Sequence, residues 1–474
     1  MRRTVVLTLM VILVALLLLG VGILRDGDTA SSNSLPPEVT AAPAYEMMYE
    51  RPLALLQCIE VFLPGGENYR ANTCMAFDDT GRMLGVYSDL DQPLTIEGRE
   101  DFALDMVACQ MMLLTAQGIP ATAHYPALDQ SACGLTEPRA RIRVRYKDGS
   151  EIELKIGSKT ASGLSCYVSR TGVADTYLVP YDFYDVMTRS LNGQHRLPGA
   201  VSYNASDAVQ LAIDGTEQGR ILAAKQENDD RALNWQVTSP VIHDASDKAV
   251  ERFVQGLCGV HAERYTATVY DADGLEAYGL RTPVRYVAAF SDGTIRDLHV
   301  GRDAGEGSVY VRMDRTGDVY EISRSQLAFA ADAALDVMMD RFVDLVPINT
   351  VRSVTIQTPN DFWLLEQDWT DDDATTAKEW TINGQAVEQR VFSGVYAALV
   401  GIQFDKTAAQ IKPTEPIMTI TYELRSGQSR QLVIMDHDPF FSAVTTSGGA
   451  DLLVRRTRFD ALLQALEVYA HETK

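Results

Sequence analysis

The sequence has few positive charges for its length and no run of them. Its 474 residues contain 42 Lys and Arg against 64 Asp and Glu, a formal net charge of −22. A surface that binds nucleic acid needs clustered positive charge to neutralise phosphates, so the composition excludes this class. With 46% hydrophobic and 22% charged residues, the chain is also unlike a disordered, collagen-like or coiled-coil protein.

The signature motifs of common enzymes are missing as well. There is no His-Glu-x-x-His, no Gly-x-Ser-x-Gly, no phosphate-binding Gly-x-x-x-x-Gly-Lys and no dinucleotide-binding fingerprint. We therefore predict that the protein is not an enzyme. We also predict no catalytic, cofactor-binding or metal-binding residues and no cofactor.

Four acidic groups are candidates for a metal site, and each has a structural interpretation that we prefer. His243 with Asp244 and Asp247 lies where a helix is predicted to begin, so we expect these residues to cap it. The two acidic loops, Asp368 with Asp371–Asp373 and Asp271-x-Asp273-Gly274, lack the spacing of an EF-hand calcium loop.

The fourth group, Asp436-His437-Asp438, precedes Pro439. Neighbouring side chains in an extended segment point to opposite faces, so these three are poorly placed to share one metal ion. We expect a solvated loop.

Cysteine is scarce and shows no metal-binding or redox spacing. The six cysteines include no Cys-x-x-Cys pair, although an even number permits disulfides outside the cytoplasm. Cys109 lies between Val107 and Met111, in an apolar segment, and we predict buried free thiols. The other five are Cys58, Cys74, Cys133, Cys166 and Cys258. Trp235 and Trp380 are each predicted to pack against the helix of their own repeat.

The N-terminus carries the strongest localisation signal. Residues 4–24 contain no charge, and about 20 apolar residues can cross a bilayer as a helix. The stretch exceeds the apolar core of a signal peptide, so we predict an uncleaved transmembrane anchor within residues 1–25, followed by a flexible linker over 26–51. Arg2 and Arg3 precede the stretch, and this places the N-terminus in the cytoplasm and the bulk of the single-pass protein outside.

The remainder of the chain repeats itself. An Asp-Gly turn is followed by a second glycine eight positions later in two copies, as Gly149 with Gly157 and Gly293 with Gly301. A third, weaker copy has Met435 at the second position. Other matching segments are 133–138 with 278–283, and 167–168 with 310–311.

The repeats alternate apolar and polar residues around their turns, which is typical of antiparallel hairpins. A helix is predicted ahead of each. The chain is therefore predicted to be α+β, with an N-terminal transmembrane helix and three tandem antiparallel-sheet units at 52–193, 198–343 and 347–474, each with one main amphipathic helix. The apolar helix positions are Leu104, Val107, Met111 and Leu114, then Val250, Phe253, Val254 and Leu257, and then Val391, Val395, Leu399 and Ile402.

This layout resembles the domain of unknown function 4340 family. The resemblance extends over nearly all of the chain after the linker and is best in the middle unit. It implies a membrane-anchored accessory protein of ABC-type export systems of the gliding-motility kind, and it supplies no catalytic residues. The matching segments are Trp235–Pro240, Tyr278–Pro283, Asp292-Gly293, Val300-Gly301 and Tyr310-Val311.

Two functions from different classes fit these observations. The first is a non-enzymatic extracytoplasmic scaffold, held in the membrane through residues 4–24, with a membrane protein such as an ABC-transporter permease as partner and no nucleic acid. The second is an extracytoplasmic module that binds or hydrolyses cell-envelope carbohydrate or peptide, with acidic residues between the units as its active groups.

Overall fold

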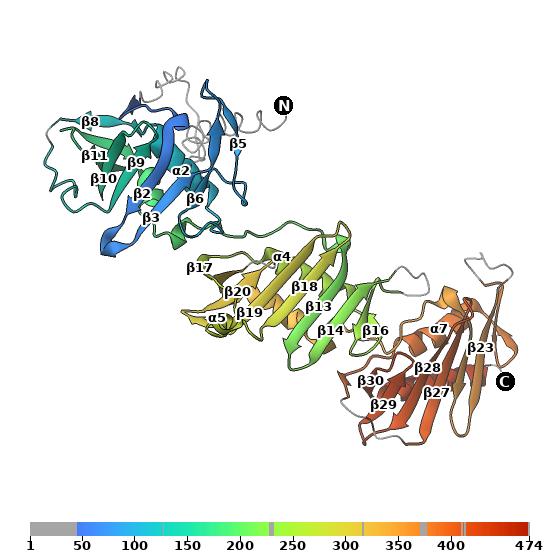
Figure 1. Ribbon diagram of the computed structural model, residues 1–474. Helices are drawn as coiled ribbons and strands as arrows, with labels where there is room; N and C mark the ends of the chain where they lie inside the picture. Colours follow the sequence, from blue (N-terminus) through green and yellow to red (C-terminus); the bar gives the residue numbers. More distant parts are fainter. Residues whose placement is uncertain are drawn as a thin grey trace, which may run out of the picture.

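The protein is built mainly of antiparallel β-sheet. A computed structural model describes residues 45–126, 128–226, 232–314, 317–369, 377–408, 411 and 414–472. These residues form five sheets (Figure 1), with 43% of residues in strands and 22% in helices. The predicted α+β class is therefore wrong, because the sequence analysis placed one helix in each repeat but missed several strands of each sheet.

The predicted transmembrane helix is also corrected. Within the described ranges, no helix is long and apolar enough to cross a membrane. Residues 4–24 and most of the predicted linker lie outside these ranges.

Three large sheets follow one another along the chain. The second and third share one order of nine strands, and the first has the same order with eight, one strand fewer at the arm side. Each begins with a hairpin arm, and its first strand pairs antiparallel with the first strand of a four-strand meander (β2 with β9, β13 with β18, β22 with β27). A short strand between arm and meander in the sequence pairs at the far edge. Figure 1 shows the three sheets arranged along an elongated body.

The strands of the first sheet, in spatial order, are β6 (Leu94–Ile96), β3 (Asn68–Thr73), β2 (Leu56–Phe62), β9 (Ala140–Tyr146), β10 (Glu151–Lys159), β11 (Ser165–Arg170), β12 (Thr176–Pro180) and β8 (Ala123–Tyr125). Two small sheets flank it: β1 (Glu46–Met47) with β7 (Pro120–Ala121), and β4 (Met75–Phe77) with β5 (Met83–Val86).

The second sheet contains β16 (His243–Ala245), β15 (Trp235–Ser239), β14 (Gly219–Lys225), β13 (Ala208–Thr216), β18 (Val284–Phe290), β19 (Ile295–Gly305), β20 (Ser308–Met313), β21 (Asp318–Ser323) and β17 (Arg264–Thr268). The third contains β25 (Gln385–Val387), β24 (Glu379–Ile382), β23 (Phe362–Asp368), β22 (Val351–Gln357), β27 (Pro416–Leu424), β28 (Ser429–Asp436), β29 (Phe441–Thr446), β30 (Asp451–Arg455) and β26 (Lys406–Thr407).

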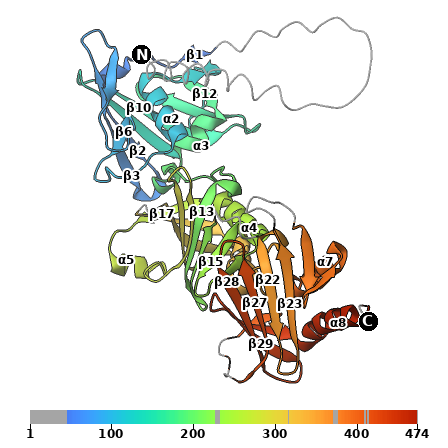
Figure 2. The same cartoon turned by 90° about the vertical axis from the view of Figure 1, so that its right-hand side faces the viewer.

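Two helical segments accompany each large sheet, one before the meander and one after it. They pack against each other in all three units, and Figure 2 shows α7 and α8 beside the third sheet. The first segments are α2 (Met106–Gln117), α4 (Asp247–Gly259) and α7 (Gln389–Val400); the second are α3 (Tyr181–Met187), the 3₁₀ segment η5 (Arg324–Ala333) and α8 (Arg456–Glu472). Two short helices are α5 (Ala272–Glu276) and α6 (Leu335–Met338).

The predicted buried face is right for α4 and wrong for α2. In α4 the apolar positions recur at helical spacing, and Val250, Phe253, Val254 and Leu257 are all buried. In α2 the predicted Val107 is 53% exposed. The buried residues there are Ala108, Cys109, Met112, Thr115 and Ala116. Because α2 is apolar on nearly every side, its sequence does not indicate which side meets the sheet.

The repeated second glycine has a steric cause. A Cβ atom at Gly157 would lie 2.2 Å from the carbonyl oxygen of Cys133, and one at Gly301 would lie 2.2 Å from that of Tyr278. The same two carbonyls accept hydrogen bonds from the next backbone amides, at 2.8 and 2.9 Å. In both copies, the turn ahead of the hairpins, at Cys133 and at Tyr278, therefore packs directly on this glycine.

Gly301→Ala should destabilise the protein by roughly 1–3 kcal/mol, because the added methyl group must displace backbone. Equilibrium urea unfolding measures this change. As a control, Gly394→Ala places a methyl group in open space within α7, and should raise stability by about 0.5–1 kcal/mol. Equal stability of Gly301→Ala and the parent protein would contradict the steric explanation.

Candidate functional site

The linker between the first two sheets comprises residues 188–207, between α3 and β13. It is hydrogen-bonded to both neighbouring units. Its backbone bonds to the segment ahead of α2, since Asp105 N donates to Gln194 O at 2.8 Å and Arg196 N donates to Ala103 O at 2.7 Å. On the side of the second sheet, Asn192 Nδ2 donates to Thr266 O at 3.2 Å. The linker is thus a structural element rather than a free tether.

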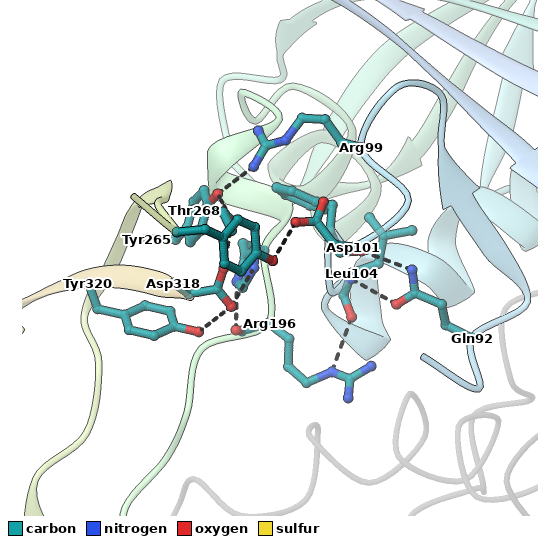
Figure 3. Close-up of polar contacts among 12 residues, drawn as sticks. Gln92, Arg99, Asp101, Leu104, Arg196, Tyr265, Thr268, Asp318 and Tyr320 are labelled. Carbon is teal, nitrogen blue, oxygen red and sulfur yellow. Dashed lines mark hydrogen bonds and ion pairs between the residues drawn. The ribbon is translucent and has the colours of Figure 1, made fainter. Parts of the chain in front are cut away.

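His195 is the centre of this junction, next to Arg196 in the chain and in contact with Tyr265; both of these are labelled in Figure 3. Its side chain is fully buried and stacks on Tyr265 of β17, with ring centroids 3.9 Å apart and an angle of 6°. Phe102 of the first unit packs edge-on at 4.7 Å. The ring therefore joins aromatic residues from both units.

A carboxylate from the second sheet faces the histidine ring. Asp318 Oδ2 lies 3.6 Å from His195 Nε2, beyond hydrogen-bond distance. The same carboxylate accepts hydrogen bonds from Thr268 Oγ1 at 2.6 Å and from Tyr320 OH at 3.1 Å. His195 Nδ1 lies 2.8 Å from the backbone oxygen of Arg196.

Polar contacts at the rim connect the same two units. Arg99 donates to the Tyr265 hydroxyl and lies over the Phe102 ring, 4.7 Å from its centroid. Tyr270 OH donates to Asp101 Oδ2 at 2.8 Å, and this hydrogen bond raises the pKa of Tyr270 to about 12. Figure 3 labels Arg99 and Asp101 of the first unit and Tyr265 of the second among these contacts.

Burial lowers the pKa of His195, and the charge of Asp318 opposes part of this effect. Arg99 and Arg196 lie close enough to disfavour a charged ring further. The folded protein therefore holds His195 neutral at a pH where an unfolded chain begins to protonate it. The enclosed ring suits a structural contact rather than proton transfer to a substrate.

The linker to the third sheet comprises residues 334–350, between η5 and β22. It is also hydrogen-bonded on both sides. Ser246 N donates to Met338 O at 2.9 Å on the side of the second sheet, and Val343 N donates to Ile402 O at 2.9 Å on the side of the third. His243 Nε2 lies 3.0 Å from Asp340 O, and the His243 ring packs edge-on against Phe404, with centroids 5.6 Å apart.

This second junction contains a buried ion pair. Arg430 Nη1 of β28 lies 3.1 Å from Asp344 Oδ1 of the linker. Burial raises the pKa of Asp344, with Arg430 opposing and Asp244 adding to the rise. Tyr396 of α7 donates to the linker carbonyl of Val346 at 2.8 Å.

For one of the four acidic groups, His243 with Asp244 and Asp247, the structure differs from the predicted role. His243 and Asp244 lie on the buried strand β16 and not at a helix end, so their predicted capping role is wrong; Ser246 is the residue before α4. Asp247 instead accepts from Asn234 Nδ2 at 2.7 Å. The sequence could not reveal the short strand because it continues directly into the helix.

The other groups form local turns. Asp438 accepts from the backbone amides of Phe440 and Phe441 at 2.7 and 2.8 Å, and Asp271 caps α5. Asp368 ends β23, and Asp371–Asp373 lie outside the described residues. In the described part of the chain, no group of three or more His, Cys, Asp or Glu could hold a metal ion.

All six cysteines are free thiols, and five of them are buried. Burial raises the pKa of Cys109 and of Cys166 to about 12, so both are poor nucleophiles. Cys74 is partly exposed and lies 3.3 Å from Thr95 Oγ1.

Strands of the first two sheets carry buried acids that form ion pairs with arginines. Glu60 on β2 lies 2.5 Å from Arg70 and 3.2 Å from Arg145. Asp297 on β19 lies 2.7 Å from Arg285. Burial alone would raise the pKa of each acid, but these ion pairs lower both.

A polar hollow of about 530 Å³ lies beside α4. It includes Trp235 at the start of β15, which is 5% exposed and so is buried as predicted. Lys225 at the rim donates to Ser206 O at 2.7 Å. The remaining lining residues are Tyr203, Asn204, Ala205, Asn234, Asp247, Val250, Glu251 and Gln255.

The fold and these junctions define a tandem antiparallel-sheet protein whose linkers are hydrogen-bonded to the units on both sides. The family model of a domain of unknown function (DUF4340) matches residues 235–419. The match runs from β15 to β27 and confirms the resemblance to this family over that part of the chain; it does not extend to the first unit. No curated protein and no solved structure matches the chain.

Stability should fall as the pH is lowered from about 7.5 towards 5. Because His195 has a lower pKa in the folded chain, the unfolded chain binds the proton first and unfolding is favoured. His195→Gln should remove this part of the pH dependence in urea unfolding. His437→Gln, at an exposed position, should retain it. If the free energy of unfolding changes with pH equally in His195→Gln and in the parent protein, His195 has no such effect.

Proposed function

We propose that this protein is a non-enzymatic extracytoplasmic scaffold, held at the cell membrane through the uncharged residues 4–24 with its N-terminus in the cytoplasm. Its partner is a membrane protein, and an ABC-type export system of the gliding-motility kind fits best. The observation that carries the proposal is the double attachment of both linkers, each of which is hydrogen-bonded to the unit on either side.

The arrangement of the sheets supports this role. Three sheets of one topology follow one another along an elongated body (Figure 1), and stacked units of this kind offer an extended surface to partners. Linkers fastened on both sides keep that surface in one shape, which is what a scaffold needs to hold a partner at a set distance.

The contacts of the ionisable groups support a structural role as well. His195 is stacked between units, Asp344 is paired with Arg430, and Asp297 is paired with Arg285. Each of these groups stabilises the packing in which it lies, and burial encloses it. These groups therefore have a structural role in the fold and do not act on a substrate.

Chemical cross-linking in intact membranes followed by affinity isolation tests the proposal. The full-length protein should recover an ABC-transporter permease or ATPase, and a copy without residues 1–24 should not. Recovery of the same proteins by both forms would contradict attachment through this segment. Recovery of glycan or peptide fragments without a protein partner would support the alternative function.

The alternative is a module that binds or hydrolyses cell-envelope carbohydrate or peptide. The hollow beside Trp235 favours binding, because it combines Lys225, Asp247 and Glu251 with amide side chains, and such a mixture of donors and acceptors suits a polar ligand.

In that case, Lys225→Ala should weaken the binding of soluble envelope glycan or peptide fragments at least about tenfold, or 1.4 kcal/mol, by calorimetry. Lys248→Ala is the matched control, since Lys248 is exposed on α4 outside the lining. Absence of binding to the parent protein would remove this alternative.

A further inference from the structure

Helix α2 has an outer face that is unusual for a surface helix. Its 12 residues, Met106–Gln117, include no charged side chain. Opposite the buried residues, helical periodicity places Met106, Val107, Gln110, Leu114 and Gln117 on one side. We name these five residues the α2 outer face. Met106 is 57% exposed and Val107 53%.

The second unit supplies an internal comparison. Helix α4 occupies the same place in the fold and has an equally apolar buried side. Its outer side, however, carries Lys248, Glu251 and Arg252, all exposed, and Arg252 pairs with Asp332 at 2.6 Å. The two equivalent helices thus differ on their outer sides: that of α4 is charged and that of α2 is uncharged. An outer side without charge is typical of a helix that another element covers.

The α2 outer face lies next to the point where the described chain begins. Arg51 N donates to Gln117 O at 2.7 Å, and Met48 N to Ile119 O at 3.0 Å. The side chains of Tyr45 and Met47 are 53% and 37% exposed beside this helix end.

The charges around α2 select the kind of partner. Asp101 and Asp105 precede the helix, and Asp182 lies on the neighbouring α3. With a net charge of −22, the protein is repelled by anionic lipid headgroups. A protein helix with basic flanking residues would instead be attracted at the rim and would cover the apolar centre.

We propose that the α2 outer face docks an uncharged apolar helix, flanked by Lys or Arg, from the membrane partner. This inference rests on the proposed function and identifies the surface that carries it. Helix α2 is about 18 Å long, which gives the partner helix three turns of contact at an axial separation of about 8–10 Å.

Site-specific photo-cross-linking tests the docking. A benzoylphenylalanine replaces Val107 in the full-length chain, and intact membranes are irradiated. Mass spectrometry should locate the adduct on an uncharged apolar segment of another membrane protein. The same probe at Gln255 of α4 is the matched control and should give no such adduct. Met106→Glu with Gln110→Glu should then reduce the Val107 adduct about tenfold or more, because both carboxylates would be buried without a partner.

The two acidic substitutions should leave folding intact, since Met106 and Gln110 are not among the buried residues of α2 and acids suit the N-terminal part of a helix. Adducts to lipid, adducts to residues 4–24 of the same chain, or no adduct while the partner still co-isolates would each overturn the docking inference and leave the scaffold proposal standing. Loss of partner recovery from the parent protein would contradict the scaffold proposal itself.

Discussion

The linkers between the sheets depend on backbone hydrogen bonds to two different units at once. In the first linker, the Arg196 amide donates to Ala103 O of the first unit, and Pro198 O accepts a hydrogen bond from the Ala262 amide of the second unit. Buried backbone groups must find partners, so a unit that moved away would leave donors and acceptors unsatisfied. This requirement joins the three sheets into one body and makes an extended binding surface physically reasonable.

Buried ionisable groups strengthen the two junctions in different ways. At the first, a neutral histidine fills an aromatic site between units, and burial keeps its pKa low. At the second, Asp344 and Arg430 compensate each other's charge within a buried site. Both arrangements tie stability to contacts between units rather than to either unit alone.

The sequence analysis was most successful where a local rule applied. The helical spacing around Val250 and Phe253 identified the buried side of α4. The equal spacing of the repeated glycines identified the internal repeat, and the structure shows that the second glycine of each pair packs against the carbonyl of Cys133 or Tyr278. It missed the short edge strands β8, β17 and β26, because two to four paired residues carry no periodic pattern. Their pairing partners lie about 50 residues away in the chain.

The junction site could not have been found from the sequence. His195 follows a turn, and its partners Phe102, Tyr265 and Asp318 are separated from it by dozens of residues. No motif connects them, because stacking and charge pairing require only proximity and not a fixed spacing. The contrast between α2 and α4 was visible in their residues, but its meaning required knowing that the two helices occupy the same place in the fold.

By itself, the sequence determined the acidic charge, the uncharged stretch at residues 4–24, the internal repetition and the turn glycines, because these are local properties of composition and spacing. The tertiary structure alone decided the predominance of β-sheet, the side of α2 that is buried, and the partners of His195 and Asp344. These depend on which distant segments meet, and that is settled by packing and by the pairing of buried polar groups.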